Sequence, residues 1–155
     1  MYKKVLIPLD GSELSEHALE HLDGIATEPR MTNIILMRVA ETLGSSSTGV
    51  SFSYETPAQA NEQAKVNARN YLEKVAKDLG EKGLDIKTVV TDGIPADDIL
   101  NYAAKNKVDL IIMSTHGRSG LVRWFSGSVA EKVIRHSPVP VLISPPRGYR
   151  SGRRG

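Results

Sequence analysis

The chain has 155 residues, the length of one ordinary domain, which can bury a core without disulfide bonds or structural metals. It contains no cysteine, which excludes thiol catalysis, and no apolar run near the roughly 20 residues that cross a bilayer. The net charge of +2 comes from residues 147–155, which carry four arginines and no acid, so the rest of the chain lacks the basic face of a nucleic-acid binder.

We therefore expect one domain over residues 1–146 and a disordered basic tail over residues 147–155. The chain begins MYKKVLIPLDG, and its first apolar run is broken by Pro8 and ended by Asp10, so it is too short for a secretory signal. These features favour a cytoplasmic protein that binds neither membranes nor nucleic acid.

Strand and helix patterns alternate along the chain. The strand candidates are apolar on successive residues, as in strands buried on both faces of a parallel sheet, and the helix candidates repeat apolar residues every three or four positions. In chain order we expect a strand at 3–9, a helix at 12–26, strands at 33–40 and 85–91 with a helix at 57–79 between them, a helix from Pro95, a strand at 108–115, a helix at 128–136 and a strand at 139–145. This order predicts an α/β domain with one doubly wound, five-stranded parallel sheet and helices on both faces, as in Rossmann-like folds.

One segment is long for a connection between a strand and a helix. Residues 41–57 read ETLGSSSTGVSFSYETP and are rich in serine. We expect a flexible insertion here, which could be a lid over a site or a tolerated loop.

Prolines mark the ends of two strands. Pro8 suits the carboxyl end of the first strand, where the chain leaves the sheet. Pro138 and Pro140 flank and enter the last strand, which therefore should lie at an edge. An open apolar edge invites association, so we expect a homodimer through this strand, with Val139, Val141 and Ile143 at the contact.

The binding site of such a sheet lies at the carboxyl ends of its strands. The segments that follow strands here are PLDGS, RVAE and STHGRSG. Gly127 and Ser128 open the helix expected at 128–136, where free backbone amides and the helix dipole favour an anion such as a phosphate. The same residues also suit an ordinary turn and an N-terminal cap, and the local pattern leaves both interpretations open.

Two common phosphate-binding motifs are absent. No lysine precedes Ser128, as the Walker A motif requires, and glycines at 117, 120 and 127 do not form G-x-G-x-x-G.

The spacing of small residues resembles another nucleotide motif. Ser114, Thr115, His116 and Gly117 are followed by nine residues and then by Gly127 and Ser128, which is similar to the G-x2-G-x9-G-[ST] motif of the universal stress protein family. The segments VLIPLDGS, GIPADDIL, VDLIIMSTHGRSG and SPVPVLI also resemble that family, so the similarity covers nearly the whole chain.

The resemblance to the ATP-binding branch implies a fold, a ligand and a set of site residues. It implies an adenine nucleotide alpha hydrolase-like sheet, a dimer through the last strand, and ATP with Mg²⁺ or Mn²⁺. Val39 would offer backbone hydrogen bonds to adenine, and Asp10 would face the ribose or a metal bound to the phosphates. The other implied ligand residues are Pro8 and Leu9 at the base, Met113 and Ser114 at the ribose, and Gly117, Arg118, Gly127, Ser128 and Val129 at the phosphates.

This chain departs from the motif at its first position. Ser114 stands where the family has glycine, so a Cβ atom and a hydroxyl occupy a place where the backbone of the family approaches the ligand.

Other chemistry-bearing residues have simpler explanations. His17 and His21 form an H-x-x-E-H pattern typical of zinc peptidases, but they lie on an ordinary amphipathic helix without a third ligand in sequence. His116 has no nucleophile or orienting acid near it in sequence. Trp124 and Phe125 suit packing of their loop onto the domain or an exposed patch for a partner.

Three functions remain. We favour a nucleotide-binding regulatory module that acts as a homodimer and presents an ATP-dependent surface to an unknown protein partner. The second is an enzyme with at most slow ATP hydrolysis, because the chain lacks a P-loop lysine and a group that would activate water. The third is a nucleotide-free interaction protein of the same family, in which Ser114 marks a pocket that no longer binds.

Overall fold

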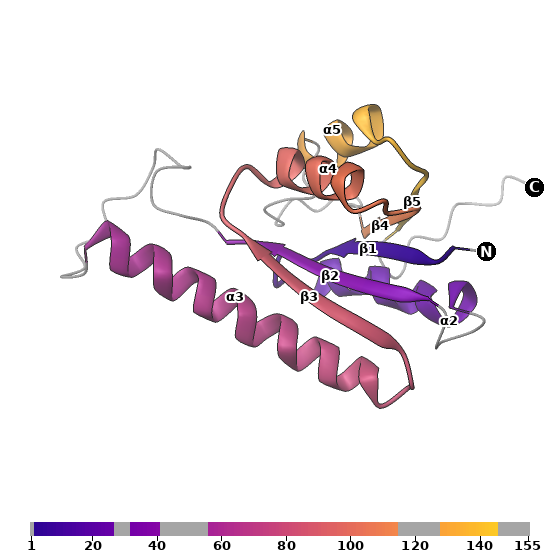
Figure 1. Ribbon diagram of the computed structural model, residues 1–155, viewed down its shortest axis with the longest axis horizontal. Coiled ribbons are helices and arrows are strands. Elements are labelled where there is room, and N and C mark those ends of the chain that lie inside the picture. Colours follow the sequence, from indigo (N-terminus) through magenta and orange to yellow (C-terminus); the bar gives the residue numbers. More distant parts are fainter. Residues whose placement is uncertain (1, 27–31, 41–55, 115–127, 146–155) are drawn as a thin grey trace, which may run out of the picture.

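The computed structural model describes residues 2–26, 32–40, 56–114 and 128–145, and the structural statements below refer to those residues. Five strands form one parallel sheet in the order β3-β2-β1-β4-β5 (Figure 1). The strands are β1 (Lys4–Pro8), β2 (Asn33–Val39), β3 (Asp85–Thr91), β4 (Leu110–Ser114) and β5 (Val141–Ser144). The expected doubly wound α/β sheet is thereby confirmed.

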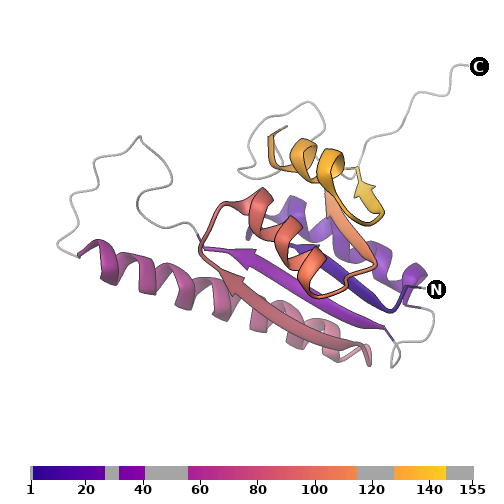
Figure 2. The same ribbon diagram turned by 45° about the horizontal axis from the view of Figure 1, so that its top comes forward.

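Helices cover both faces of the sheet, as Figure 2 shows from a second direction. On one face lie α1 (Glu13–Glu16), the 3-10 helix η1 (His17–His21), α2 (Leu22–Ile25) and the long α3 (Pro57–Gly80). On the other lie α4 (Pro95–Lys105) and α5 (Ser128–His136). No helix of the described segments is long and apolar enough to cross a membrane.

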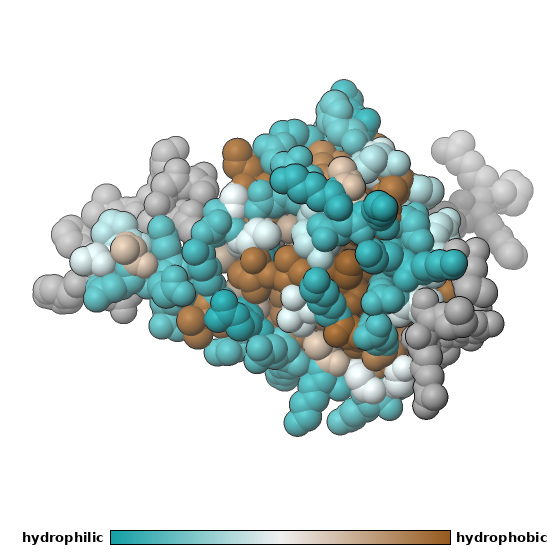
Figure 3. Space-filling view, in the orientation of Figure 1, coloured by the Kyte–Doolittle hydropathy of each residue, from teal (hydrophilic) through white to brown (hydrophobic). Residues whose placement is uncertain are grey.

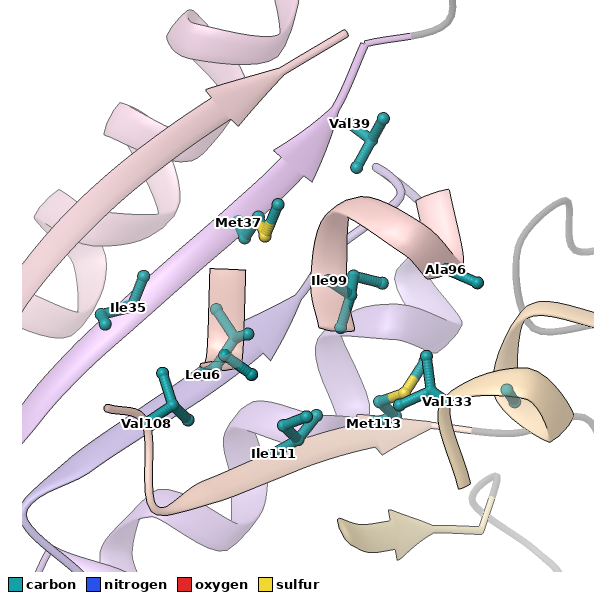
Figure 4. Packing of buried hydrophobic residues seen from close by; sticks show 12 residues of the cluster. Leu6, Ile35, Met37, Val39, Ala96, Ile99, Val108, Ile111, Met113 and Val133 are labelled. Carbon is teal, nitrogen blue, oxygen red and sulfur yellow. The ribbon is translucent and has the colours of Figure 1, made fainter. Parts of the chain in front are cut away.

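Each face has its own apolar cluster, because successive residues of a strand point to opposite sides. Leu6 and Met113 of the strands pack with Ile99 of α4 and Val133 of α5, as Figure 4 shows. Val5 and Ile7 of β1, Ile34 and Leu36 of β2, and Leu110 and Ile112 of β4 form the opposite cluster with Ala18, Leu22 and Leu72 of the helices. Strands buried on both faces explain the uninterrupted apolar runs of the sequence.

The edge strand β3 is only partly covered. Helix α3 packs on one of its faces, yet Ile86 and Val90 on that face and Val89 on the other are all half-buried. Figure 3 shows hydrophobic side chains gathered in this part of an otherwise mostly hydrophilic surface.

The first helical segment differs from the single helix that we expected over residues 12–26. It begins as expected, because Ser12 accepts a hydrogen bond from the Ser15 amide at 3.1 Å and caps α1. The segment then tightens into η1 before α2 begins at Leu22. The buried residues follow steps of three and four from Ser15 to Ala18 and Leu22, a spacing that suits a 3-10 helix and an α-helix equally well.

The expected end of the first strand and the expected edge position of the last strand are both confirmed. β1 ends at Pro8, and β5 lies at the edge of the sheet. The prediction that Pro140 enters β5 is wrong by one residue, because β5 begins at Val141 and the Pro140 carbonyl accepts a hydrogen bond from the Ile111 amide. Val139 therefore precedes the strand in which we had placed it, while Val141 and Ile143 lie within β5.

Candidate functional site

Strand β2 runs further than β1, so among the described residues the last residues of β2 have no β1 residue paired with them. The ladder between them ends where the Leu9 amide donates to the Met37 carbonyl at 2.8 Å. Residues that alternate along a strand direct their peptide groups to opposite neighbours. The N–H and C=O of Val39 therefore point to the side that the chain has left after β1, while Ala40 donates to the Thr91 carbonyl of β3 at 2.6 Å.

The turn after β1 holds one carboxylate oxygen of Asp10 in place, while the other has no hydrogen-bond partner in the described part of the chain. The Ser12 amide donates to Oδ1 of Asp10 at 2.8 Å, and the Asp10 amide donates to Oγ of Ser15 at 3.3 Å. Oδ2 of Asp10 is buried and has no hydrogen-bond partner among the described residues. A buried carboxylate oxygen without a partner is costly, which makes this atom a candidate contact for a ligand at the turn.

Pro8 and Leu9 bring the chain from β1 to this turn. Both residues are buried, and Leu9 belongs to the cluster on the face of α1 and α3. The turn is therefore anchored on its strand side by packed side chains.

Met113 and Ser114 end β4 with their side chains on opposite faces. Met113 is fully buried under α5, in the cluster of Ala130 and Val133. Ser114 is also fully buried, but its Oγ lies 3.5 Å from the Ser15 carbonyl, on the face of α1. The hydroxyl that replaces the glycine of the motif thus points away from α5.

The described part of helix α5 spans Ser128–His136, the range that we expected for this helix. Ser128 is exposed, and Val129 packs at the margin of the cluster that contains Met113 and Val39. The structure thus brings Val39, Met113 and Val129 to one face of the sheet. The remaining predicted ligand residues, Gly117, Arg118 and Gly127, lie outside the described residues, as do His116, Trp124, Phe125, most of the serine-rich segment and the basic tail.

The histidines of the zinc-like pattern lie in η1. Nε2 of His21 is 2.9 Å from Oγ of Ser144, and Nδ1 of His17 is buried without a hydrogen-bond partner in the described part of the chain. No group of three or more His, Asp or Glu side chains that could hold a metal ion is found in the segments that the structure describes.

Two features near the carboxyl end of β3 were missed in the sequence. Oγ1 of Thr91 is buried and lacks a partner among the described residues, and Thr91 pairs with Val39 in the register. A shallow depression of about 360 Å³ lies beside it. Its lining residues are Thr91, Asp92, Gly93, Asp98, Asn101, Tyr102, Lys105 and Asn106. In the sequence, the only indication of these features is the polar pair that follows the apolar residues of the strand, as in VVTD.

Known proteins resemble this chain in sequence and in fold. Residues 1–145 match the model of the universal stress protein family. The universal stress protein MJ0531 of Methanocaldococcus jannaschii is 39% identical over 145 residues, which are 92% of this chain and 82% of that protein. The chain belongs to the universal stress protein family.

Solved structures agree with this family assignment. The structure of hypothetical protein MJ0577, from the same organism, superposes with a TM-score of 0.76 at 31% identity and covers 96% of this chain and 99% of its own. A universal stress protein family protein from Arabidopsis thaliana, solved with AMP bound, has the same fold, with a TM-score of 0.66 at 16% identity over 94% of this chain and 93% of its own.

Proposed function

We propose that this universal stress protein binds an adenine nucleotide, ATP with Mg²⁺ or Mn²⁺, at the carboxyl ends of β1, β2 and β4. The observation that carries the proposal is the buried Oδ2 of Asp10, which has no partner among the described residues and lies on the turn next to the unpaired end of β2. The Arabidopsis protein, which shares this fold and was solved with AMP bound, is consistent with it.

The backbone of Val39 would recognise the base. Its N–H and C=O point away from β3, and one donor beside one acceptor matches the hydrogen-bonding edge of adenine. Pro8 and Leu9 would lie against the base, and Met113 and Ser114 would lie on the ribose side.

The start of α5 would hold the phosphates. Helix α5 has nine residues, and its first amides and its dipole favour an anion next to Ser128 and Val129. Gly117, Arg118 and Gly127 belong to the same proposal on the strength of the sequence motif.

Asp10 would hold the metal ion. Oδ1 is fixed by the Ser12 amide, which leaves Oδ2 for a hard cation of the kind that carboxylates prefer. A divalent cation would neutralise phosphate charge, and the pairing of Asp10 with a ribose hydroxyl is the alternative for the same oxygen.

We further propose that the protein works as a homodimer and a regulatory module. Strand β5 lies at the edge of the sheet, and Val141 and Ile143 on it are half-buried in the single chain. A second copy of the chain would cover this edge, and Val139 would flank the contact. The dimer would present an ATP-dependent surface to a protein partner.

Titration calorimetry with ATP, in the presence of Mg²⁺ and in the presence of EDTA, tests the nucleotide proposal. We expect saturable binding by the natural chain, loss of binding in Gly127→Val, and loss of the metal effect in Asp10→Asn. Lys74→Met, which changes an exposed residue on α3, serves as the matched control.

The alternatives give different results in the same experiment. If ATP binds neither in the presence of Mg²⁺ nor in the presence of EDTA, the result favours a nucleotide-free interaction protein and overturns our proposal. Binding followed by rapid phosphate release favours an ATP-hydrolysing enzyme. Full binding by Gly127→Val would place the phosphates elsewhere.

A further inference from the structure

Arg38 of β2 lies next to the turn that carries Asp10. Its side chain lies on the face opposite to that of Val39, toward α3, and its guanidinium stands 4.9 Å from the centre of the Tyr71 ring. A cation over an aromatic face is attracted by the negative potential of the ring, and the flat guanidinium stacks well on it. Tyr71 thereby fixes the position of Arg38.

Tyr71 is in turn tied to the helix that follows the turn. Its hydroxyl donates to Oε1 of Glu16 at 2.8 Å, and Glu16 ends α1. Burial and this hydrogen bond raise the pKa of Tyr71, so the phenol remains protonated as a donor. The contact joins α3 to α1 across the surface of the sheet.

The guanidinium packs against the turn at Gly11. Gly11 has a φ angle of +85°, and a Cβ atom there would lie 2.9 Å from Nη1 of Arg38. The glycine therefore lets Arg38 approach the backbone of the turn, between Asp10 and the capping residue Ser12. The contacts run from Gly11 to Arg38, from Arg38 to Tyr71 and from Tyr71 to Glu16, and α1 connects Glu16 back to the turn. We name this set of residues the arginine clamp.

We propose that Arg38 is a positioning residue that holds the Asp10–Ser12 turn so that Oδ2 of Asp10 faces the metal ion of the bound nucleotide. The proposal rests on the nucleotide site proposed above and adds to it a residue that lies outside the ligand motif. Arg38 would act through the backbone of Gly11 rather than through a contact of its own with the nucleotide.

The clamp should affect the metal rather than the nucleotide as a whole. The base contacts of Val39 and the amides of α5 do not depend on the turn, whereas Asp10 is carried by it. Residues that orient a metal ligand typically change metal affinity by about 10–100-fold when they are replaced. A residue with a merely structural role would lower stability and leave the metal effect intact.

The test compares Arg38→Met with the natural chain and with Lys74→Met, an exposed cation on α3 changed in the same way. The readout is the ratio of ATP affinity with Mg²⁺ to ATP affinity in EDTA, measured by calorimetry. We expect Arg38→Met to reduce this ratio about tenfold and to leave the affinity in EDTA unchanged. Tyr71→Leu, which removes the ring under the guanidinium, should reduce the ratio in the same direction.

A second readout needs no nucleotide. Hydrogen exchange of the Ser12 amide reports the hydrogen bond to Oδ1 of Asp10, and we expect faster exchange in Arg38→Met than in Lys74→Met. An unchanged affinity ratio in Arg38→Met, with ATP bound by the natural chain, would overturn the clamp. If the natural chain does not bind ATP, the proposed nucleotide site is refuted instead. If, in addition, Arg38→Met leaves the exchange of the Ser12 amide unchanged, the proposed role of Arg38 in holding the turn is refuted as well.

Discussion

Replacing Gly11 with alanine should destabilise the protein, because the new methyl group meets both a backbone and a side-chain obstacle. The φ angle of +85° is a left-handed conformation that side-chain-bearing residues rarely adopt. The added Cβ would also lie 2.9 Å from Nη1 and 3.1 Å from Cζ of Arg38. The guanidinium lies at the end of a flexible side chain and can shift away from the new Cβ, but the shift weakens its contact with the Tyr71 ring.

The size of the effect can be worked out from these two terms. A left-handed backbone at a residue other than glycine costs about 1–2 kcal/mol. Displacement of Arg38 from the ring forfeits a cation–π contact of about 0.5–2 kcal/mol. The sum is about 1.5–4 kcal/mol, which lowers the melting temperature of a chain of this size by about 3–16 °C.

Gly83 provides the matched control. It has a φ of +80°, but a Cβ atom there would find no atom within 4 Å. Gly83→Ala should therefore show the backbone term alone, about 1–2 kcal/mol. Urea unfolding of both variants, each also in an Arg38→Ala background, separates the two terms.

The test is whether the cost of Gly11→Ala depends on the presence of the Arg38 side chain. We expect Gly11→Ala to cost less once Arg38 is truncated, while the cost of Gly83→Ala stays the same. Equal losses for Gly11→Ala in both backgrounds would show that Arg38 does not pack against the turn, and the reasoning would be refuted.

Three further predictions follow from single side chains. Burial and the Glu16 contact raise the pKa of Tyr71, so the folded state holds this proton more tightly than the unfolded state does. The free energy of unfolding should therefore fall as the pH rises above about 10, the pKa of an unfolded phenol. Urea titrations from pH 8 to 11 should show a smaller fall for Tyr71→Phe. Ile99→Ala empties a fully buried site under α4 and should cost about 2–5 kcal/mol by the same unfolding assay, and a loss below 1 kcal/mol would mean that the site collapses. Ser114→Gly restores the family motif, but the hydroxyl points toward Ser15, so calorimetry should find the ATP affinity unchanged.

The sequence predicted the strands and the long helices well, because their signals are local. The run DIKTVVT matches β3 residue for residue, and the helix expected over 57–79 spans Pro57–Gly80. The tightening into η1 could not be predicted, since buried positions three and four residues apart are compatible with either type of helix.

The candidate site was predicted less completely than the fold. The position of Asp10 after β1 follows from topology, but the lack of a partner for Oδ2 among the described residues depends on three-dimensional packing. Arg38 and Tyr71 meet across two elements that are far apart in sequence, and no spacing rule indicates such a contact. The orientation of Ser114 depends on the register of β4, which fixes the face of each side chain.

Helix α3 is longer than the sheet beneath it requires. None of its first eleven residues is buried, and burial begins at Ala68. In Figure 1 the first turns of α3 project past the end of the sheet. The projecting turns are held by the capping box of Thr56 and Gln59 and by the ion pair of Lys65 with Asp92 at 2.7 Å. No residue of either apolar cluster comes from these turns, so a fluorophore or an affinity tag attached there should leave the interior of the protein intact.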